Sequence, residues 1–320
     1  MSVLAGKRVL VTGASGFIGA NLVRALLDQD AQVHAVVRSP AGSWRLQEVL
    51  HRITAHAADI TDGDAVKAAV RQSRPDFVCH LAATHGHPMD AGGRARALQV
   101  SVMGTSNLLE AVRESECCRF VHVGSSLEYG PRSRPLRETD PLLPTTFRGV
   151  VKAASMLLCL QFWREQVRPV VMLRPFSVYG PWESPERLIP TAIRAALDGL
   201  PLDLTAPGIR RDPVFVADVV QACLLALTEP RAVGQVINVG SGQQVTNEQI
   251  VEAVQIATGR TLHIRVGAHQ PHPPDTTCWV ADIRRAARLL HWAPSYTLDQ
   301  GLRATVEWHQ RHPASLAGAS

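Results

Sequence analysis

Several features that would mark a particular class of protein are missing from this chain of 320 residues. Only three of its 33 basic residues are lysine, and no run of Lys and Arg resembles a nucleic-acid-binding arm. No apolar run approaches about 18 residues, and no signal peptide is apparent, so we expect no membrane segment. The six cysteines include no Cys-x-x-Cys pair and no zinc-ligand spacing. We therefore expect no metal, and reduced thiols in a cytoplasmic protein.

Apolar residues make up 46% of the chain, which argues against disorder. A chain of this length can bury roughly three-quarters of its unfolded surface in a core. The net charge is 33 − 28 = +5, with the basic residues scattered among acids. That charge suits a phosphorylated ligand, but it equally suits an ordinary solvated surface.

Short apolar runs alternate with helical patterns along the first half of the chain. Strand, helix and strand in regular succession predict an α/β fold with a doubly wound parallel sheet, the Rossmann arrangement, covered by helices on both faces. The expected strands are 8–11, 32–37, 53–57, 77–81, 119–123 and 170–174, and the expected helices are 18–27, 64–71, 97–113 and 150–166.

The pattern changes after about Phe176, where proline becomes frequent. Helical patterns at 187–197, 217–227, 247–256 and 283–290 predict a smaller lobe interwoven with the first domain. One strand in it, near 236–239, is expected to return to the main sheet. We predict a first domain over 1–175, a C-terminal lobe over 176–313, and a flexible tail over 314–320.

Residues 9–19 have the pattern of a buried strand, a glycine turn and the start of a helix. In such a turn Gly13 permits the tight bend, Gly16 lets the backbone approach a pyrophosphate, and Gly19 lets the helix pack closely on the sheet. The helix N-terminus then offers free N–H groups and its positive dipole end to phosphates. The first domain is thus predicted to bind a dinucleotide, with contacts from Gly13, Ser15, Gly16, Phe17, Ile18 and Gly19.

The end of the second expected strand selects between cofactors. A carboxylate there would bind the ribose 2′-hydroxyl of NAD, but this chain has Arg38 followed by Ser39. Since Arg38 can pair with a 2′-phosphate, we expect NADP or NAD, with NADP favoured. Asp59 and Ile60 are expected beside the adenine, Leu81, Ala82 and Ala83 beside the cofactor, and His80 as a packed residue at the end of the fourth strand.

Several motifs occur in the order typical of one enzyme family. The glycine turn, residues 80–83, residues 124–130, Lys152, residues 173–181 and residues 208–212 resemble those of the extended short-chain dehydrogenases. More narrowly, the chain is similar to the NAD-dependent nucleotide-sugar epimerase/dehydratase family from about residue 7 to residue 309. The resemblance implies an enzyme that acts on a nucleotide sugar or related polyol through a keto intermediate. It also implies that residues 176–313 bind the substrate.

The resemblance implies roles for individual residues. Ser125 matches the serine or threonine that hydrogen-bonds the reacting oxygen, and Lys152 matches the lysine that holds the nicotinamide ribose. Arg211 matches an arginine that contacts the nucleotide diphosphate, and Ser177 stands where many members place a substrate-binding asparagine. The expected substrate-binding residues are His85, Ser126, Ser177, Arg211 and Arg284.

Arg148 stands where the family places the tyrosine of its Tyr-x-x-x-Lys segment. Tyrosinate takes up the hydroxyl proton during hydride transfer, whereas a guanidinium with a pKa above about 12 cannot. Arg148 can instead stabilise a developing alkoxide or clamp an anion. The dehydratases carry an acidic pair after the Ser125 position, where this chain has Ser126 and Leu127, so an ordinary sugar 4,6-dehydratase is disfavoured. The expected catalytic residues are Ser125, Arg148 and Lys152.

Three interpretations of this substitution stay open. The chain is an enzyme whose proton path runs through Ser125, water or another side chain; or it is an altered or inactive member that binds cofactor and ligand; or it performs an elimination or rearrangement without net redox. The candidate relays are Glu128, Tyr129, His85, His87 and Tyr179.

The expected helices 97–113 and 150–166 carry apolar faces. Related enzymes pair such helices across a two-fold axis, so the resemblance implies a homodimer. The same faces would alternatively serve to cover the sheet. The residues concerned are Val102, Leu108, Leu109, Val112, Met156, Leu157, Leu160 and Trp163.

Overall fold

A parallel sheet of seven strands runs through the molecule in the computed structural model, which describes residues 2–84, 90–165, 168–269 and 276–313. The strand order is β11-β6-β5-β4-β1-β2-β3, so the chain winds outward in both directions from β1. This is the doubly wound α/β fold that the sequence predicts. The strands are β1 (Arg8–Thr12), β2 (Gln32–Val37), β3 (Thr54–Ala57), β4 (Phe77–His80), β5 (Arg119–Val123), β6 (Val170–Pro175) and β11 (Val236–Val239).

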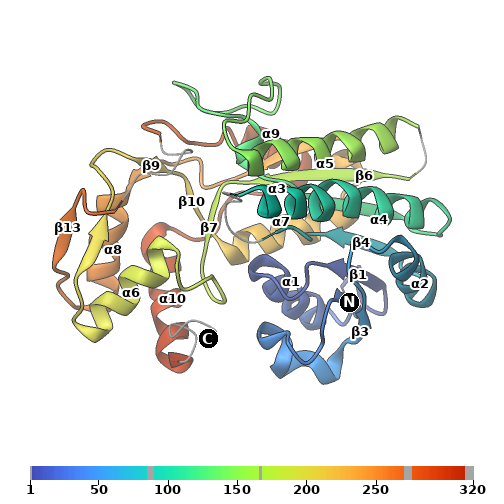
Figure 1. Cartoon of the computed structure of the whole chain (residues 1–320), viewed down its shortest axis with the longest axis horizontal. Coiled ribbons are helices and arrows are strands. Elements are labelled where there is room, and N and C mark those ends of the chain that lie inside the picture. Colours follow the sequence, from blue (N-terminus) through green and yellow to red (C-terminus); the bar gives the residue numbers. More distant parts are fainter. Residues whose placement is uncertain (1, 85–89, 166–167, 270–275, 314–320) are drawn as a thin grey trace.

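Helices cover both faces of the sheet, because successive strand residues point to opposite sides. Val9 and Val11 of β1 join an apolar cluster with α1 and α7, whereas Leu10 joins another with α2, α4 and α5. Figure 1 shows α4 and α5 above the sheet and α1 below it. The helices are α1 (Phe17–Asp28), α2 (Gly63–Ser73), α3 (Ala91–Leu98), α4 (Gly104–Arg113), α5 (Phe147–Arg164), α7 (Val216–Thr228) and α9 (Arg284–Leu290).

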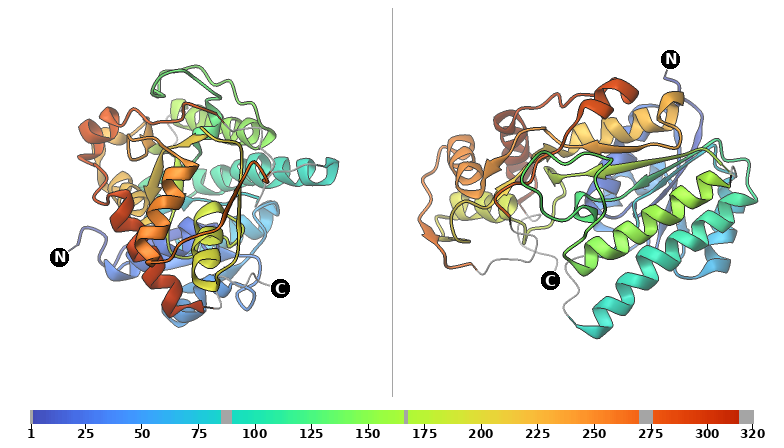
Figure 2. Two further views of the ribbon diagram at one scale, coloured as in Figure 1. Left: turned by 90° about the vertical axis from the view of Figure 1, so that its left-hand side faces the viewer. Right: turned by 90° about the horizontal axis from the view of Figure 1, so that it is seen from above.

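The smaller lobe lies beyond one end of the sheet (Figures 1 and 2). Helix α8 packs between two others, α6 and α10, and three two-stranded sheets complete the lobe. Strand β11 leaves the lobe and pairs in parallel with β6, as expected. The elements are β7 (Ser177–Tyr179), α6 (Leu188–Asp198), β8 (Leu202–Leu204), β9 (Arg210–Arg211), β10 (Pro213–Phe215), β12 (Val245–Thr246), α8 (Asn247–Thr258), β13 (Ile264–Val266) and α10 (Leu298–Arg311).

The structure contains short helical turns that the sequence pattern did not distinguish. A 3₁₀ helix, η1 (Trp44–Arg52), follows β2, and a π turn, η2 (Gln99–Met103), joins α3 to α4 within the expected helix 97–113. Two further 3₁₀ turns are η3 (Ser126–Glu128) and η4 (Pro230–Ala232). No helix in the described part of the chain has the length and apolar character needed to cross a membrane. The expected tail over 314–320 lies outside the described residues.

Candidate active site

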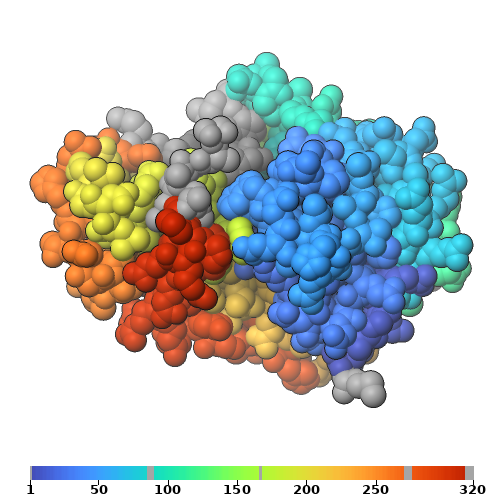
Figure 3. Space-filling model, turned by 90° about the horizontal axis from the view of Figure 1, so that it is seen from below, coloured from blue at the N-terminus to red at the C-terminus, as the bar shows by residue number. Residues whose placement is uncertain are grey.

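A cleft of about 1150 Å³ opens where the carboxyl ends of the central strands face the smaller lobe. Figure 3 shows the surfaces of the N-terminal half and of the C-terminal lobe meeting along a seam. In this sheet the winding direction changes between β1 and β4, and open parallel sheets bind ligands at such a switch point. The cleft is lined by Gly13, Ser15, Gly16, Phe17, Ile18, Gly19, Arg38, Asp59, Ile60, Leu81, Ala82 and Ala83, all expected cofactor contacts, and by Ser125, Ser126, Arg148, Lys152, Ser177 and Arg211.

The glycine turn has no space for a side chain at Gly13 or Gly19. Gly13 has φ +68°, and a Cβ there would lie 2.6 Å from the carbonyl carbon of Leu81. A Cβ on Gly19 would lie 2.1 Å from the carbonyl oxygen of Gly13. Gly16 is the N-cap of α1, and the first turn of this helix carries no acidic residue to repel an anion. These features fit a dinucleotide pyrophosphate at the helix N-terminus.

Arg38 and Asp59, which the sequence predicts near the adenosine of the cofactor, both line the cleft. Arg38 follows β2 and is exposed in the cleft wall. Asp59 accepts hydrogen bonds from the backbone N–H and hydroxyl of Thr61 and pairs with Arg96 at 2.7 Å. His80 is buried with its ring nitrogens 2.7 and 2.8 Å from the hydroxyls of Thr12 and Thr105. Burial lowers the pKa of His80 to about 3, so this ring is a neutral packing group.

Two cations project into the cleft from the start of α5. The hydroxyl of Thr146 caps this helix by accepting a hydrogen bond from the N–H of Gly149, which fixes where the first turn begins. Arg148 and Lys152 lie four residues apart and therefore on one face of the helix. The ammonium of Lys152 donates to the carbonyl of Val123 at 2.9 Å. Burial and, to a smaller degree, repulsion by the nearby Arg148 lower the pKa of Lys152 to about 8.

Arg148 lies in a positively charged environment. Burial lowers its pKa, and repulsion by Arg187, which also lines the cleft, contributes in the same direction. Arg211 of β9 adds another guanidinium to the cleft wall. The described cleft therefore concentrates positive charge around the N-terminus of α5, which is itself the positive end of a helix dipole.

Ser125 and Ser126 are positioned by a short capping turn. The Ser125 hydroxyl accepts a hydrogen bond from the N–H of Leu127 at 3.2 Å, and its own N–H donates to Glu128 at 2.8 Å. The Ser126 hydroxyl accepts a hydrogen bond from the indole N–H of Trp279 at 3.1 Å. Trp279, which the sequence did not single out, thus joins the last part of the chain to the cleft.

Three of the five candidate proton relays face the interior instead of the cleft. The Glu128 carboxylate is fully buried and pairs with Arg174 at 2.5 Å. The buried Tyr129 hydroxyl donates to Asn238 at 2.7 Å and accepts from Arg174 at 2.8 Å. The Tyr179 hydroxyl donates to the carbonyl of Leu298. Burial raises the pKa of both phenols, which removes them further from proton exchange at neutral pH. The other two, His85 and His87, lie outside the described residues.

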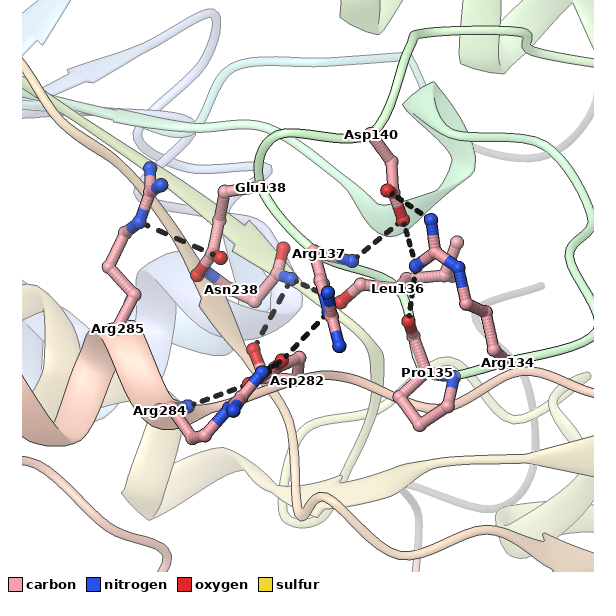
Figure 4. A network of polar contacts seen from close by, with 10 residues as sticks. All are labelled: Arg134, Pro135, Leu136, Arg137, Glu138, Asp140, Asn238, Asp282, Arg284 and Arg285. Carbon is pink, nitrogen blue, oxygen red and sulfur yellow. Dashed lines mark hydrogen bonds and ion pairs between the residues drawn. The ribbon is translucent and has the colours of Figure 1, made fainter.

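Arg284 does not join the other substrate-binding candidates. It begins α9, is 77% exposed, and its guanidinium pairs with Asp282 outside the described cleft lining. Figure 4 shows that this arginine belongs to a polar network that ties residues 134–140 to β11 and α9. The main chain of Leu136 also bonds to Val280 and Asp282, so the network fixes the segment that leads into α5. Its members include Arg134, Arg137, Glu138, Asp140, Asn238, Asp282 and Arg285.

The fold and cleft define a dinucleotide-binding α/β protein of the extended short-chain dehydrogenase type. The chain belongs to the NAD dependent epimerase/dehydratase family, whose model matches residues 9–240. A dTDP-glucose 4,6-dehydratase of Neisseria meningitidis serogroup B is 31% identical, over 95% of this chain and 93% of its own length. Relatives of this kind are NAD-dependent sugar-nucleotide dehydratases and epimerases, so the expected enzyme class is confirmed.

Solved structures agree with this family. An epimerase, Mth375, of Methanothermobacter thermautotrophicus has a TM-score of 0.90 and 28% identity, covering 98% of this chain and 95% of its own. A UDP-glucuronic acid 4-epimerase of Bacillus cereus, in complex with UDP-glucuronic acid and NAD, has a TM-score of 0.86 and 28% identity, covering 95% of this chain and 99% of its own. The described cleft residues therefore lie in a fold that binds nucleotide sugars in relatives.

Proposed function

We propose that this chain oxidises a nucleotide sugar to a keto intermediate and completes an epimerisation or related conversion without a tyrosine in the proton path. The observation that carries the proposal is the presence of Ser125, Arg148 and Lys152 in one cleft with the glycine turn. The named relatives support a nucleotide sugar as substrate. Residues 1–175 would bind the cofactor and residues 176–313 the sugar nucleotide.

Each catalytic side chain has a role that its chemistry allows. The nicotinamide of the bound cofactor supplies the hydride acceptor for the carbon that bears the substrate hydroxyl. The Ser125 hydroxyl hydrogen-bonds the reacting oxygen, and Arg148 holds negative charge that develops on it, since a fixed cation in a dry site stabilises an alkoxide without proton transfer. As the hydride leaves, the hydroxyl proton would pass through Ser125 and water to the neutral form of Lys152, whose lowered pKa leaves part of its amine deprotonated near neutral pH. Lys152 would also orient the cofactor.

Epimerisation is favoured over 4,6-dehydration, although the curated relatives are dehydratases. Elimination of water needs an acid and a base beside Ser125, whereas this chain has Ser126, bonded to Trp279, and Leu127. The test is incubation of the purified chain with NAD⁺ and UDP-glucose, UDP-glucuronic acid or dTDP-glucose, followed by NMR of the products. A 4-epimer as product would support the proposal. A 4-keto-6-deoxy product would contradict the preference for epimerisation over dehydration. If none of the three sugars is converted, the chain is a binding protein and the proposed activity is wrong.

We propose NAD as the cofactor, since the solved relatives are named as NAD complexes, in place of the NADP preference drawn from Arg38. Arg38 is exposed at the adenosine end and is not needed for a 2′-hydroxyl. We expect Arg38→Ala to leave the Kd for NAD⁺ within about twofold, measured by isothermal titration. Tighter binding of NADP⁺ than NAD⁺ by the wild-type chain, lost in Arg38→Ala, would restore the NADP preference.

We propose that the chain forms a homodimer through α4, α5 and the turn between α3 and α4. Leu108, Leu109 and Met156 are buried against the chain's own core, so these residues cover the sheet. Met103 and Leu157, in contrast, are about half exposed. Other exposed apolar residues of this face are Leu98 and Val150.

The variant Leu157→Glu is expected to shift the mass in light scattering from two chains to one, because it places a charge in the proposed apolar interface. Ile256→Glu is the matched control, since Ile256 is an exposed apolar residue of α8 in the smaller lobe. A wild-type chain that is already monomeric, or a dimer insensitive to Leu157→Glu, would rule out this interface.

A further inference from the structure

One buried carboxyl in the cleft has an oxygen that nothing in the described structure satisfies. Glu183 follows β7 and is only 5% exposed. Its Oε1 lies 3.6 Å from Nε of Arg187, but its Oε2 is buried with no hydrogen-bond partner. Buried polar atoms are nearly always bonded, so an unpartnered carboxylate oxygen at a ligand cleft requires a physical reason.

The other acidic side chains of the described cleft lining differ from Glu183 in this respect. Asp59 is bonded to Thr61 and Arg96. The Asp90 carboxylate caps α3 by accepting from the N–H of Gly93. Glu186 accepts a hydrogen bond from the hydroxyl of Ser184. Glu183 is therefore the acid of this lining that retains a buried acceptor for a ligand.

The backbone holds Glu183 in place at an energetic cost. The preceding residue, Trp182, has φ +70°, a left-handed conformation that is unfavourable for a non-glycine residue. Arg45 donates to the Trp182 carbonyl at 2.8 Å, and Asn21 donates to the Pro181 carbonyl at 2.9 Å. The guanidinium of Arg24 lies 4.2 Å from the centre of the Trp182 ring. Contacts from α1 and η1 thus fix a strained turn that presents Glu183 to the cleft.

The surroundings of Glu183 favour a ligand that donates a hydrogen bond. Burial raises the pKa of Glu183 to about 7, although Arg187 and the backbone of Gly180 act on the carboxyl group in the opposite direction. The charge of Glu183 also contributes to the raised pKa of Tyr179. The charge of Arg187 in turn contributes to the lowered pKa of Arg148. A phosphate would be repelled by the carboxylate, whereas a hydroxyl donor would satisfy Oε2 and stabilise the charged form.

We propose that Glu183 is a ligand-binding residue whose Oε2 accepts a hydrogen bond from a sugar hydroxyl of a bound nucleotide. The hydroxyl belongs either to a ribose of the cofactor or to the nucleotide sugar, and both sources share the same chemistry. This inference rests on the proposed function, since it is there that both ligands enter the cleft. Without ligand, Oε2 of Glu183 has no hydrogen-bond donor, and the bound ligand would supply one.

The test combines ligand affinity with the stability of the apo chain. Glu183→Leu should raise the Kd for either NAD⁺ or UDP-glucuronic acid by about 10- to 100-fold in isothermal titration, since a hydrogen bond to a charged group is lost. The probe that is weakened identifies the source of the hydroxyl. In the wild-type chain the same Kd should fall as pH rises from 6 to 8, because the carboxyl ionises near pH 7, and in Glu183→Gln it should stay flat.

Apo stability distinguishes a binding carboxyl from a structural ion pair. Folding raises the pKa of Glu183 from 4.5 to about 7, so its contribution to stability falls as pH rises through that window. Glu183→Gln should therefore raise the Tm of the apo chain by about 2–4 °C at pH 8 and leave it unchanged at pH 4. Asp140→Asn is the matched control, because this buried carboxylate accepts hydrogen bonds from the Arg134 guanidinium and the Arg137 N–H, which lower its pKa, so its loss should lower Tm at pH 8.

Two results would overturn the inference alone: Kd values for both probes that stay within twofold of wild type in Glu183→Leu, or a Tm of Glu183→Gln that falls at pH 8. The second result would mark the contact with Arg187 as structural. A wild-type chain that binds neither probe would overturn the proposed function and this inference with it, so the two failures are distinguishable.

Discussion

Replacement of Arg148 by alanine is expected to lower kcat with the chain's own nucleotide-sugar substrate by about 10²- to 10³-fold, the usual cost of removing a group that holds a developing oxyanion. KM should change much less, because the guanidinium acts most strongly when negative charge develops. Arg148→Lys keeps the charge without the planar fork and should retain intermediate activity. Steady-state kinetics with the product followed by NMR measures all three chains.

Folding of the variant is checked in the same experiment. Arg148 is repelled by Arg187 and itself lowers the pKa of Lys152. The Tm of Arg148→Ala, measured beside its kcat, separates lost chemistry from lost fold. Arg164→Ala, at the exposed far end of the same helix, is the control and should leave kcat unchanged. Arg148→Tyr should create ordinary dehydrogenase behaviour, with a phenol that titrates in the kcat profile. Unchanged turnover in both Arg148→Ala and Arg148→Tyr would exclude this side chain from the chemistry.

Removal of Arg174 should produce the largest loss of stability. Its guanidinium and the Glu128 carboxylate are 2% and 0% exposed, and no water can replace a lost partner. Arg174→Met would strand a buried carboxylate and is expected to lower the free energy of unfolding by about 3–5 kcal/mol. Urea denaturation at pH 7, with the transition midpoint and slope compared with wild type, measures the change.

The same pair supports the active site, because Glu128 also accepts the N–H of Ser125. Arg174→Met should therefore lower kcat as well, although Arg174 lies outside the described cleft lining. The double variant Arg174→Met with Glu128→Leu removes both charges and should recover most of the lost stability. A single variant as stable as the wild-type chain would show that the pair contributes no net stabilisation.

The glycine turn and the sheet were predictable because local pattern determines them. Residues 32–37 and 119–123 became strands at their expected bounds, and β11 returned to the sheet, since buried parallel strands need continuous apolar runs. Helix α10 was missed, although Thr297 and Gln300 form a capping box that announces its start. The 3₁₀ turn η3 was also missed, although Ser125 and Glu128 form a capping box at its start, because a single turn has too few residues for a helical period to appear.

The site was only partly predictable, because side-chain direction and long-range contacts decide it. Glu128 and Tyr129 adjoin Ser125 in sequence, yet the capping turn directs them toward Arg174 and away from the cleft. Trp279 reaches Ser126 across 153 positions of sequence, a contact that no local pattern announces. Glu183 was missed for a related reason: its burial and its unpartnered oxygen exist only in the folded chain.

The most direct measurement is a crystal structure of the wild-type chain with NAD⁺ and the nucleotide sugar that it converts. We expect the Arg148 guanidinium within hydrogen-bond distance of the substrate oxygen at the reacting carbon, with the Ser125 hydroxyl on that same oxygen. An Arg148 side chain turned into solvent, with the phenol of another residue beside the nicotinamide, would contradict the proposed proton path.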